Sequence, residues 1–367
     1  MPRWAAILLV LLALSKIDEA FGGAWEDNNI PNNVMNQLTE VGANSSANWT
    51  GDMDFVSLTV SEDILKVDQV FDDGWSHYVY IIAFDRFLSK DFKSISAKAS
   101  LKIKSIGEQI EKILIEHPDA VFGISLKPGM ETFYKMPDGM SQTYWHLAFE
   151  NDKEVRETYH KLWEIISKDL KHISNNNLIF NVLNEPEFEQ MKAWNKRELW
   201  QEWSTEIVDA IRKVSPGRTI IIEGIHKGLW ARHGNPANLL LPIDRTNIIY
   251  GFHYYAHEEL KVMPYLGEVK SHMSQLIDYS NKYNVPVVLS EIGLHGKCDG
   301  LGPDPEDRAK YVEVVYDTLI PADIGITWWS IDSPANSPYQ RVNGSCNRNL
   351  DKELIKDEEL FLALNLN

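Results

Sequence analysis

The sequence predicts an α/β fold, a single-domain (β/α)8 barrel of the TIM type, on three observations. From about residue 60, short apolar runs alternate with amphipathic helical stretches, and strands that are apolar throughout are typical of a parallel sheet covered by helices. Seven such strands fall within about 250 residues, which fits an eight-stranded barrel better than an open sheet. No glycine-rich phosphate loop follows any strand, which argues against a nucleotide-binding sheet.

The predicted strands follow one another at regular intervals. Each is a short apolar run bounded by polar residues, glycine or proline. The runs are Val79–Phe84, Ala120–Leu126, Leu178–Leu183, Arg218–Ile222, Ile248–Phe252, Val285–Leu289 and Gly325–Trp329. We expect the missing first strand between residues 38 and 60, where the pattern is weak.

Helices are predicted between these strands because apolar residues recur there at intervals of three and four. Ile103, Ile106, Ile110 and Ile113 form one such stripe, and Pro118 ends it. The other predicted helices lie around residues 155–170, 199–211, 269–283, 306–319 and 351–364. Residues 22–37 are expected to form an irregular arm.

The charge balance excludes several classes of partner. The chain of 367 residues has 36 Lys and Arg against 53 Asp and Glu, a formal charge of −17. A nucleic-acid binder or a protein that adheres to anionic lipid needs positive charge, so we expect neither partner. Twelve Trp and fourteen Tyr need a large core or a surface on which ligands stack. We expect a monomer.

The N-terminus has the pattern of a secretory signal peptide, assigned to residues 1–21. Arg3 supplies a positive charge, Ala5–Leu14 is an apolar run too short to span a bilayer, and Ala13-Leu14-Ser15 offers small residues for cleavage. The alternative is a buried N-terminal helix. We expect a secreted, extracellular protein whose barrel domain comprises residues 22–367.

Two further features fit a secreted chain. Asn44, Asn48 and Asn343 each begin an Asn-x-Ser/Thr triplet, the acceptor pattern for N-glycosylation, although such triplets also arise by chance. The sequence contains only two cysteines, Cys298 and Cys346. In an oxidising compartment their simplest state is one disulfide.

Polar residues at the carboxyl ends of barrel strands indicate where the chemistry lies, because active sites of this fold are built there. The run from Leu178 ends in Asn184 and Glu185, and the run from Val285 ends in Glu291. The sixth and eighth barrel strands lead into a further group, His253, Tyr254, Tyr255 and Trp329. We expect these side chains to face one bowl.

Two carboxyl groups beside aromatic side chains are typical of glycosidic bond cleavage. A protonated carboxyl donates to the leaving oxygen, and an ionised one attacks or stabilises the anomeric carbon. The plainer alternative is that each glutamate is a solvated strand-end residue. His253 and His257 have the spacing of a metal pair, but no third ligand accompanies them, and we expect no metal and no cofactor. No serine or cysteine nucleophile motif is present.

These residues resemble glycoside hydrolase family 5, the cellulase-like (β/α)8 barrels of clan A. The string Leu178–Pro186 resembles the strand that carries the acid/base of that family, and Val287–Gly293 resembles its nucleophile strand. His253-Tyr254-Tyr255 resembles the His-x-Tyr of the sixth strand, and Trp329-Ser330 resembles the end of the eighth. The resemblance covers roughly residues 55–335.

The resemblance implies a role for each site residue. Glu185 would be the general acid/base and Glu291 the nucleophile of a retaining mechanism, with carboxyl groups about 5 to 5.5 Å apart. Asn184 would bind the sugar 2-hydroxyl, and His253 would contact the acid/base or the substrate. Tyr255 would form a hydrogen bond with the nucleophile. Trp329 would form the floor of a sugar subsite, and Trp145 would be a further residue on which a sugar stacks.

Two departures from the family pattern concern the nucleophile. The second strand of the family normally carries an Arg, and the aligned residues Val79–Ile82 contain none unless Arg86 approaches from a shifted register. The third strand normally ends in a His, where Ser125-Leu126-Lys127 stands here. We expect Lys127 to replace part of the missing positive charge and Tyr80 to donate a hydrogen bond.

The predicted function is a secreted retaining hydrolase of internal bonds in a β-linked polysaccharide, most simply a β-glucan of the cellulose type. A β-mannan substrate is the alternative within the same chemistry. A glycan-binding relative with little or no catalysis is the alternative of another class, which the two missing partners motivate.

Overall fold

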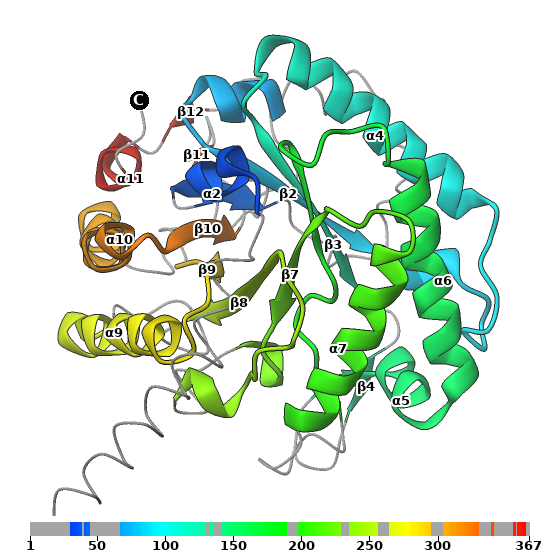
Figure 1. Cartoon of the computed structure of the whole chain (residues 1–367). Helices are drawn as coiled ribbons and strands as arrows, with labels where there is room; N and C mark the ends of the chain where they lie inside the picture. The colour runs from blue at the N-terminus through cyan, green and yellow to red at the C-terminus, as the bar shows by residue number, and fades with distance from the viewer. Residues whose placement is uncertain are drawn as a thin grey trace, which may run out of the picture.

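The computed structural model describes residues 30–38, 40–44, 67–129, 133–135, 141–188, 197–228, 235–255, 264–294, 304–329, 339–340, 355–356 and 358–364. Their central feature is a closed barrel of eight parallel strands, which confirms the predicted fold class (Figure 1). In spatial order the strands are β1 (Val41–Asn44), β10 (Gly325–Trp329), β9 (Val287–Ile292), β8 (Ile248–Tyr254), β7 (Thr219–Glu223), β6 (Leu178–Asn181), β3 (Val121–Lys127) and β2 (His77–Ala83).

The first strand lies between residues 38 and 60, where the sequence predicted it. β1 has only four residues, and it closes the barrel by pairing with β10 on one side and with β2 on the other. Val41 faces Ile326 in the register with β10, and Ala43 faces Tyr78 in the register with β2. The weak pattern therefore reflects the shortness of this strand.

Helices surround the barrel with their apolar stripes turned inward. They are α4 (Lys98–Glu116), α5 (Tyr144–Asn151), α6 (Lys153–Asp169), α7 (Arg197–Arg212), α9 (Leu266–Tyr283) and α10 (Pro305–Leu319). In Figure 1, α4, α6 and α7 cover one side of the barrel, and α9 and α10 cover the opposite side. Within the described ranges, no helix combines the length and apolar character that crossing a bilayer requires.

A short N-terminal helix corrects the prediction of an irregular arm. α2 (Asn32–Leu38) buries Val34 and Leu38 against the first inward-facing residues of several strands. Those residues include Val121, Ile179 and Ile249. Apolar burial of this kind closes the amino-terminal end of the barrel, where α2 acts as a plug.

The helix near the C-terminus is shorter than predicted. In place of one helix over residues 351–364, the structure has the two-residue strand β12 (Ile355–Lys356) and then α11 (Glu358–Ala363). β12 pairs with β11 (Tyr339–Gln340), and a second small antiparallel pair joins β4 (Phe133–Lys135) to β5 (Ser141–Thr143). Cys298, Cys346, Asn48 and Asn343 lie outside the described residues, so the disulfide and those glycosylation sites stay predictions.

A buried histidine lies at the start of β2, near the plugged end. The side chain of His77 is fully buried, with Nε2 2.9 Å from the Thr327 hydroxyl and Nδ1 3.1 Å from the Gln37 carbonyl oxygen. Because a carbonyl oxygen only accepts, Nδ1 carries the proton and Nε2 accepts from Thr327. Burial lowers the pKa of His77 to about 4, so its ring is neutral.

Candidate active site

Glu185 and Glu291 both lie at the carboxyl end of the barrel. Glu291 is the fifth residue of β9, and only 3% of its side chain is exposed. Glu185 follows β6 in a turn whose φ of 53° is unusual for a residue other than glycine. Its backbone N–H donates to Glu223 Oε2 at 2.8 Å, which helps to hold the strained turn in place.

The two carboxyl groups approach each other closely. One oxygen of Glu185, one oxygen of Glu291 and a ring nitrogen of His253 all lie within 4.8 Å of one another. The glutamates therefore share one face of the barrel, as the strand-end rule predicted.

His253 stands between the two glutamates at the centre of the site. Its Nδ1 is 3.3 Å from Glu185 Oε1 and 3.2 Å from Glu291 Oε2, and its ring has no exposed surface. Its Nε2 is 3.1 Å from Glu223 Oε2. Burial by itself would lower the pKa of His253, but the negative charges of Glu223, Glu291 and Glu185 raise it well above its usual value.

Glu223 is a residue of this cluster that the sequence did not identify. It ends β7, and 1% of its side chain is exposed. The predicted strand ends one residue earlier, at Ile222, which places Glu223 outside the strand and not at its carboxyl end. The same rule that selected Glu185 and Glu291 would have found it, had the strand been extended to its last buried position.

Two neutral side chains orient Glu291. The Tyr255 hydroxyl donates to Oε2 at 2.9 Å, and burial followed by the charge of Glu291 raises the tyrosine pKa so far that its proton stays on. The Asn184 amide, oriented to match its neighbours, donates to Oε1 at 2.9 Å. The pKa of Glu291 is raised by burial; His253 and Lys127 oppose this rise, while Glu185 and Glu223 add to it.

Lys127, the last residue of β3, points into the site. Its ammonium is 2.7 Å from Glu185 Oε2, so the cation replacing the family histidine contacts the acid/base candidate. Burial opposes the charged form, but Glu185 and Glu291 raise the pKa of Lys127 above its ordinary value. The lysine is therefore a buried cation paired with a carboxylate.

The expectation that Tyr80 donates a hydrogen bond to Glu291 is wrong. The Tyr80 ring packs between Tyr78 at 4.9 Å and Phe122 at 6.2 Å, on the side of β2 that faces the helices. Side chains alternate along a strand, and the residues of β2 that face the barrel interior are His77, Val79 and Ile81. The prediction therefore placed Tyr80 on the wrong face of β2. Arg86 lies beyond β2, in the 3-10 helix η1 (Phe84–Phe87), and is exposed.

The site carries its own cations. Lys127 and protonated His253 supply two positive charges against the three carboxylates Glu185, Glu223 and Glu291. A single proton on Glu185 then makes the cluster neutral. Within the described part of the chain, Glu185, His253 and Glu291 are the one group whose atoms are close enough to share a metal ion. The ammonium and imidazolium already occupy those oxygens, which disfavours a further cation.

Trp329 and Trp145 have different surroundings. Trp329 ends β10, is half-buried, and meets the Tyr255 ring edge-to-face at 6.2 Å beside the glutamates. Trp145 is completely buried in α5, in ring contact with Phe84 at 4.7 Å and Tyr159 at 4.8 Å. A ring without exposed surface cannot stack on a sugar, so the prediction for Trp145 is wrong and this residue belongs to the core.

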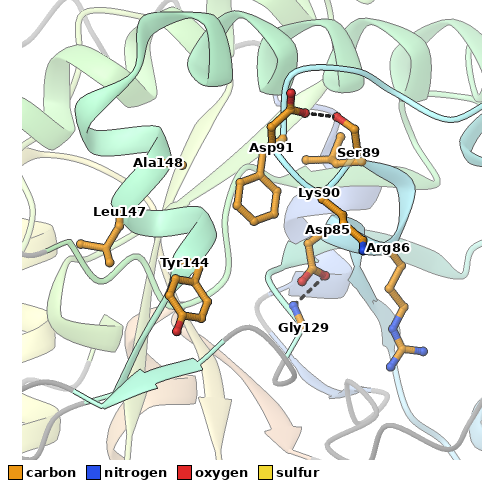
Figure 2. Close-up of a pocket in the computed structure, with 11 residues that line it drawn as sticks. Asp85, Arg86, Ser89, Lys90, Asp91, Gly129, Tyr144, Leu147 and Ala148 are labelled. Atoms are coloured by element: carbon orange, nitrogen blue, oxygen red, sulfur yellow. Dashed lines mark hydrogen bonds between the residues drawn. The ribbon is translucent and has the colours of Figure 1, made fainter.

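A pocket of about 760 Å³ opens beyond β2 and β3. Figure 2 shows Tyr144 of α5 on one side and Asp85 and Arg86 of η1 on the other. Gly129, two residues after Lys127, donates its N–H to Asp85 at 2.8 Å, and a Cβ at this glycine would lie 2.9 Å from that carboxylate. The volume is in the range of small-molecule sites, and 53% of the Tyr144 surface is exposed.

Comparison with known proteins is consistent with this geometry. Residues 138–334 match the sequence model of the cellulase family, glycosyl hydrolase family 5. The chain belongs to this family. The match spans β6 to β10 and includes both Glu185 and Glu291. Among curated proteins, no sequence matches this glycosyl hydrolase.

Solved endoglucanases share the fold of this family 5 hydrolase. Thermotoga maritima Cel5A in complex with mannotriose superposes with a TM-score of 0.66 at 16% identity, covering 90% of this chain and 99% of that one. A mutant form of the same enzyme with cellobiose gives 0.67 at 17%, covering 90% and 98%. A broad-specificity endoglucanase from Clostridium acetobutylicum gives 0.66 at 14%, covering 90% and 98%. At these identities the similarity shows the fold alone.

Proposed function

We propose that this glycoside hydrolase is secreted and cleaves internal bonds of a cellulose-type β-glucan with retention of configuration at the anomeric carbon. The observation that carries the proposal is the pair of carboxyl oxygens of Glu185 and Glu291 within 4.8 Å of each other. Retaining enzymes hold these groups about 5 to 5.5 Å apart, whereas inverting enzymes separate them by about 6.5 to 9.5 Å to admit a water molecule.

In the first step, the ionised carboxylate of Glu291 attacks the anomeric carbon. Protonated Glu185 gives its proton to the glycosidic oxygen as the bond from carbon to that oxygen breaks, and the leaving sugar departs as an alcohol. Tyr255 and Asn184 hold Glu291 by one hydrogen bond on each oxygen, so that the carboxylate is oriented before substrate binds.

In the second step, Glu185 is ionised and takes a proton from water. The resulting hydroxide equivalent attacks the anomeric carbon, the bond to Glu291 breaks, and the sugar is released with its original configuration. The ammonium of Lys127, 2.7 Å from Glu185, favours the ionised form that this step needs. The same contact opposes protonation of Glu185 for the first step, so we expect ionisation of Glu185 to limit activity on the alkaline side, while the raised pKa of Glu291 limits it on the acidic side.

The charge arrangement supports catalysis over the glycan-binding alternative. A binding protein has no need of an orienting tyrosine, an amide and two cations around buried carboxylates, which are costly to bury. The family arginine is absent, but His253 and Lys127 supply the positive charge that a carboxylate nucleophile requires.

The pocket beside β3 supports internal cleavage. Gly129, two residues after Lys127, lines it, and the exposed Tyr144 ring offers a surface on which a further sugar of a polymer can stack. β-Mannan remains the second candidate substrate, since the same fold in Thermotoga maritima Cel5A has been observed with both cellobiose and mannotriose.

The test is hydrolysis of a substrate panel by the purified full-length protein. We expect new reducing ends from carboxymethylcellulose or mixed-linkage β-glucan, products of mixed length, and initial formation of the β-anomer by proton NMR. Glu291→Gln should reduce the rate at least about 10³-fold. If the protein binds glucans or mannans but hydrolyses none of them, the hydrolase proposal fails and the glycan-binding alternative replaces it. For secretion, the protein recovered from the medium of eukaryotic cells should begin near residue 22.

A further inference from the structure

Hydrogen-bond donors surround the carboxyl group of Glu223. Its Oε1 accepts from Asn181 Nδ2 at 2.5 Å and from the Ser290 hydroxyl at 3.2 Å, and its Oε2 accepts from the Glu185 backbone N–H at 2.8 Å. His253 Nε2 approaches the same Oε2 to 3.1 Å. Three donors therefore meet the two oxygens of Glu223, and the His253 ring lies within ion-pair distance of Oε2.

The ring of His253 faces carboxylates from both nitrogens. Nδ1 meets Glu185 and Glu291, and Nε2 meets Glu223. A neutral imidazole has one N–H, so one of its nitrogens would present a lone pair to a carboxylate. Only the imidazolium carries a proton on both nitrogens and a positive charge that all three carboxylates attract.

We propose that Glu223 is a positioning residue that keeps His253 positively charged beside Glu291. The inference rests on the proposed function and deepens it. Glu223 is too deep in the site to meet a substrate, with 1% of its surface exposed, and it acts through the ring that lies 3.2 Å from Glu291. The imidazolium then supplies the positive charge that an arginine gives elsewhere in the family.

The surrounding charges show why Glu223 is needed. His253 is buried, and burial favours the neutral ring. The groups that face it are Glu223 from β7, Glu291 from β9, and Glu185 from the turn after β6. In the first step Glu185 carries a proton, and Lys127 of β3 contacts Glu185. Glu223 is the partner at Nε2, 3.1 Å away, and it has no part in the proton transfers of either step, so we assign to its charge the role of holding the proton on that nitrogen.

Glu223→Gln tests the assignment because the amide oxygen keeps an acceptor while the charge is removed. The direct readout is the ¹⁵N shift of the His253 ring nitrogens, assigned by comparison with His253→Gln, which requires no substrate. We expect the wild-type ring to be an imidazolium at pH 8, and to lose its proton at least about one pH unit lower in Glu223→Gln.

The kinetic readout is the pH profile of kcat/KM on the substrate that the panel identifies. In Glu223→Gln we expect near wild-type values at low pH, where His253 is still charged, and an alkaline limb that moves to lower pH together with the His253 titration. At pH 8 the loss should be roughly 10- to 100-fold. Glu150→Gln is the matched control, because Glu150 is a buried glutamate on α5. This change should alter neither the titration of His253 nor the pH profile of kcat/KM.

Two outcomes overturn the assignment. A neutral His253 in the wild-type protein at pH 7 would do so even if Glu223→Gln fails to fold. Equal titration of His253 in wild type and Glu223→Gln would show that Glu223 is only structural. If the wild-type protein hydrolyses nothing, the proposed function fails, whereas the NMR titration still decides whether Glu223 controls the charge of His253.

Discussion

His253 and His77 lie at opposite ends of one barrel, and neither ring has exposed surface. His77 at the plugged end has two hydroxyls and a carbonyl as partners, and burial lowers its pKa to about 4. His253 at the catalytic end is equally buried, yet three carboxylates raise its pKa well above the usual value. The comparison shows that burial sets the default of a neutral ring and that placed negative charge overrides it.

The difference matches what each end does. At the plugged end, the neutral ring of His77 forms hydrogen bonds that join β2, β10 and the α2 segment. At the catalytic end, several buried charges share a small volume, which is expensive for folding and useful for reactions in which charge develops.

The largest expected effect is that of removing the charged ring. His253→Gln deletes the cation beside Glu291, and we expect kcat/KM to fall roughly 10²- to 10³-fold at every pH. The matched change at the other end, His77→Gln, should leave kcat/KM at the wild-type value, because that ring contacts no reacting group. Equal losses in the two variants, measured on the same substrate, would contradict the distinction between the two ends.

The next effect concerns stability at the plugged end. Unfolded histidine takes up a proton near pH 6.5, whereas folded His77 does so only near pH 4, so the unfolded state binds more protons between these values. This group therefore lowers the free energy of unfolding as pH falls from 6.5 to 4, by about 3 kcal/mol.

Denaturant unfolding of wild type and His77→Gln between pH 4 and pH 7 measures this contribution. The variant should be less stable at pH 7 and should lose less stability on acidification. Parallel curves over this range would show that His77 does not titrate as its surroundings indicate.

The smallest effect is a shift of the pH profile on removing Lys127. Lys127→Met leaves Glu185 without its buried cation and makes the carboxyl harder to ionise, so the alkaline limb of kcat/KM should move up by about one pH unit. Lys127→Arg keeps the charge and should keep the limb near its wild-type position. If the alkaline limb of kcat/KM does not move in Lys127→Met, or moves to lower pH, Lys127 does not stabilise the ionised form of Glu185. A move to lower pH is the result expected for Glu223→Gln.

The sequence was most informative where the pattern repeats. Continuous apolar strands separated by amphipathic helices predicted the barrel, and the strand-end rule selected Glu185 and Glu291 from different parts of the chain. These predictions succeed because parallel strands in a closed barrel bring their carboxyl ends to one face, whatever their separation in sequence.

The errors came from choices that a single residue decides. Ending the fifth barrel strand at Ile222 excluded Glu223, and choosing the wrong face of β2 directed Tyr80 inward. Trp145 failed for another reason, because a tryptophan after a strand has the same sequence signal whether it stacks on sugar or fills the core. Only the packing of Phe84, Phe149 and Tyr159 around it distinguishes these cases.

The central claim is that Glu291 is an ionised, covalent nucleophile although the arginine of the family is missing. A 2-deoxy-2-fluoro-β-cellobioside with a dinitrophenyl leaving group slows release of the intermediate and allows it to be trapped. Peptide mass spectrometry of the trapped protein should find the fluorosugar on Glu291 and on no other residue. Label on Glu185 or Glu223, or steady hydrolysis of β-glucan with no trapped sugar at all, would contradict the account.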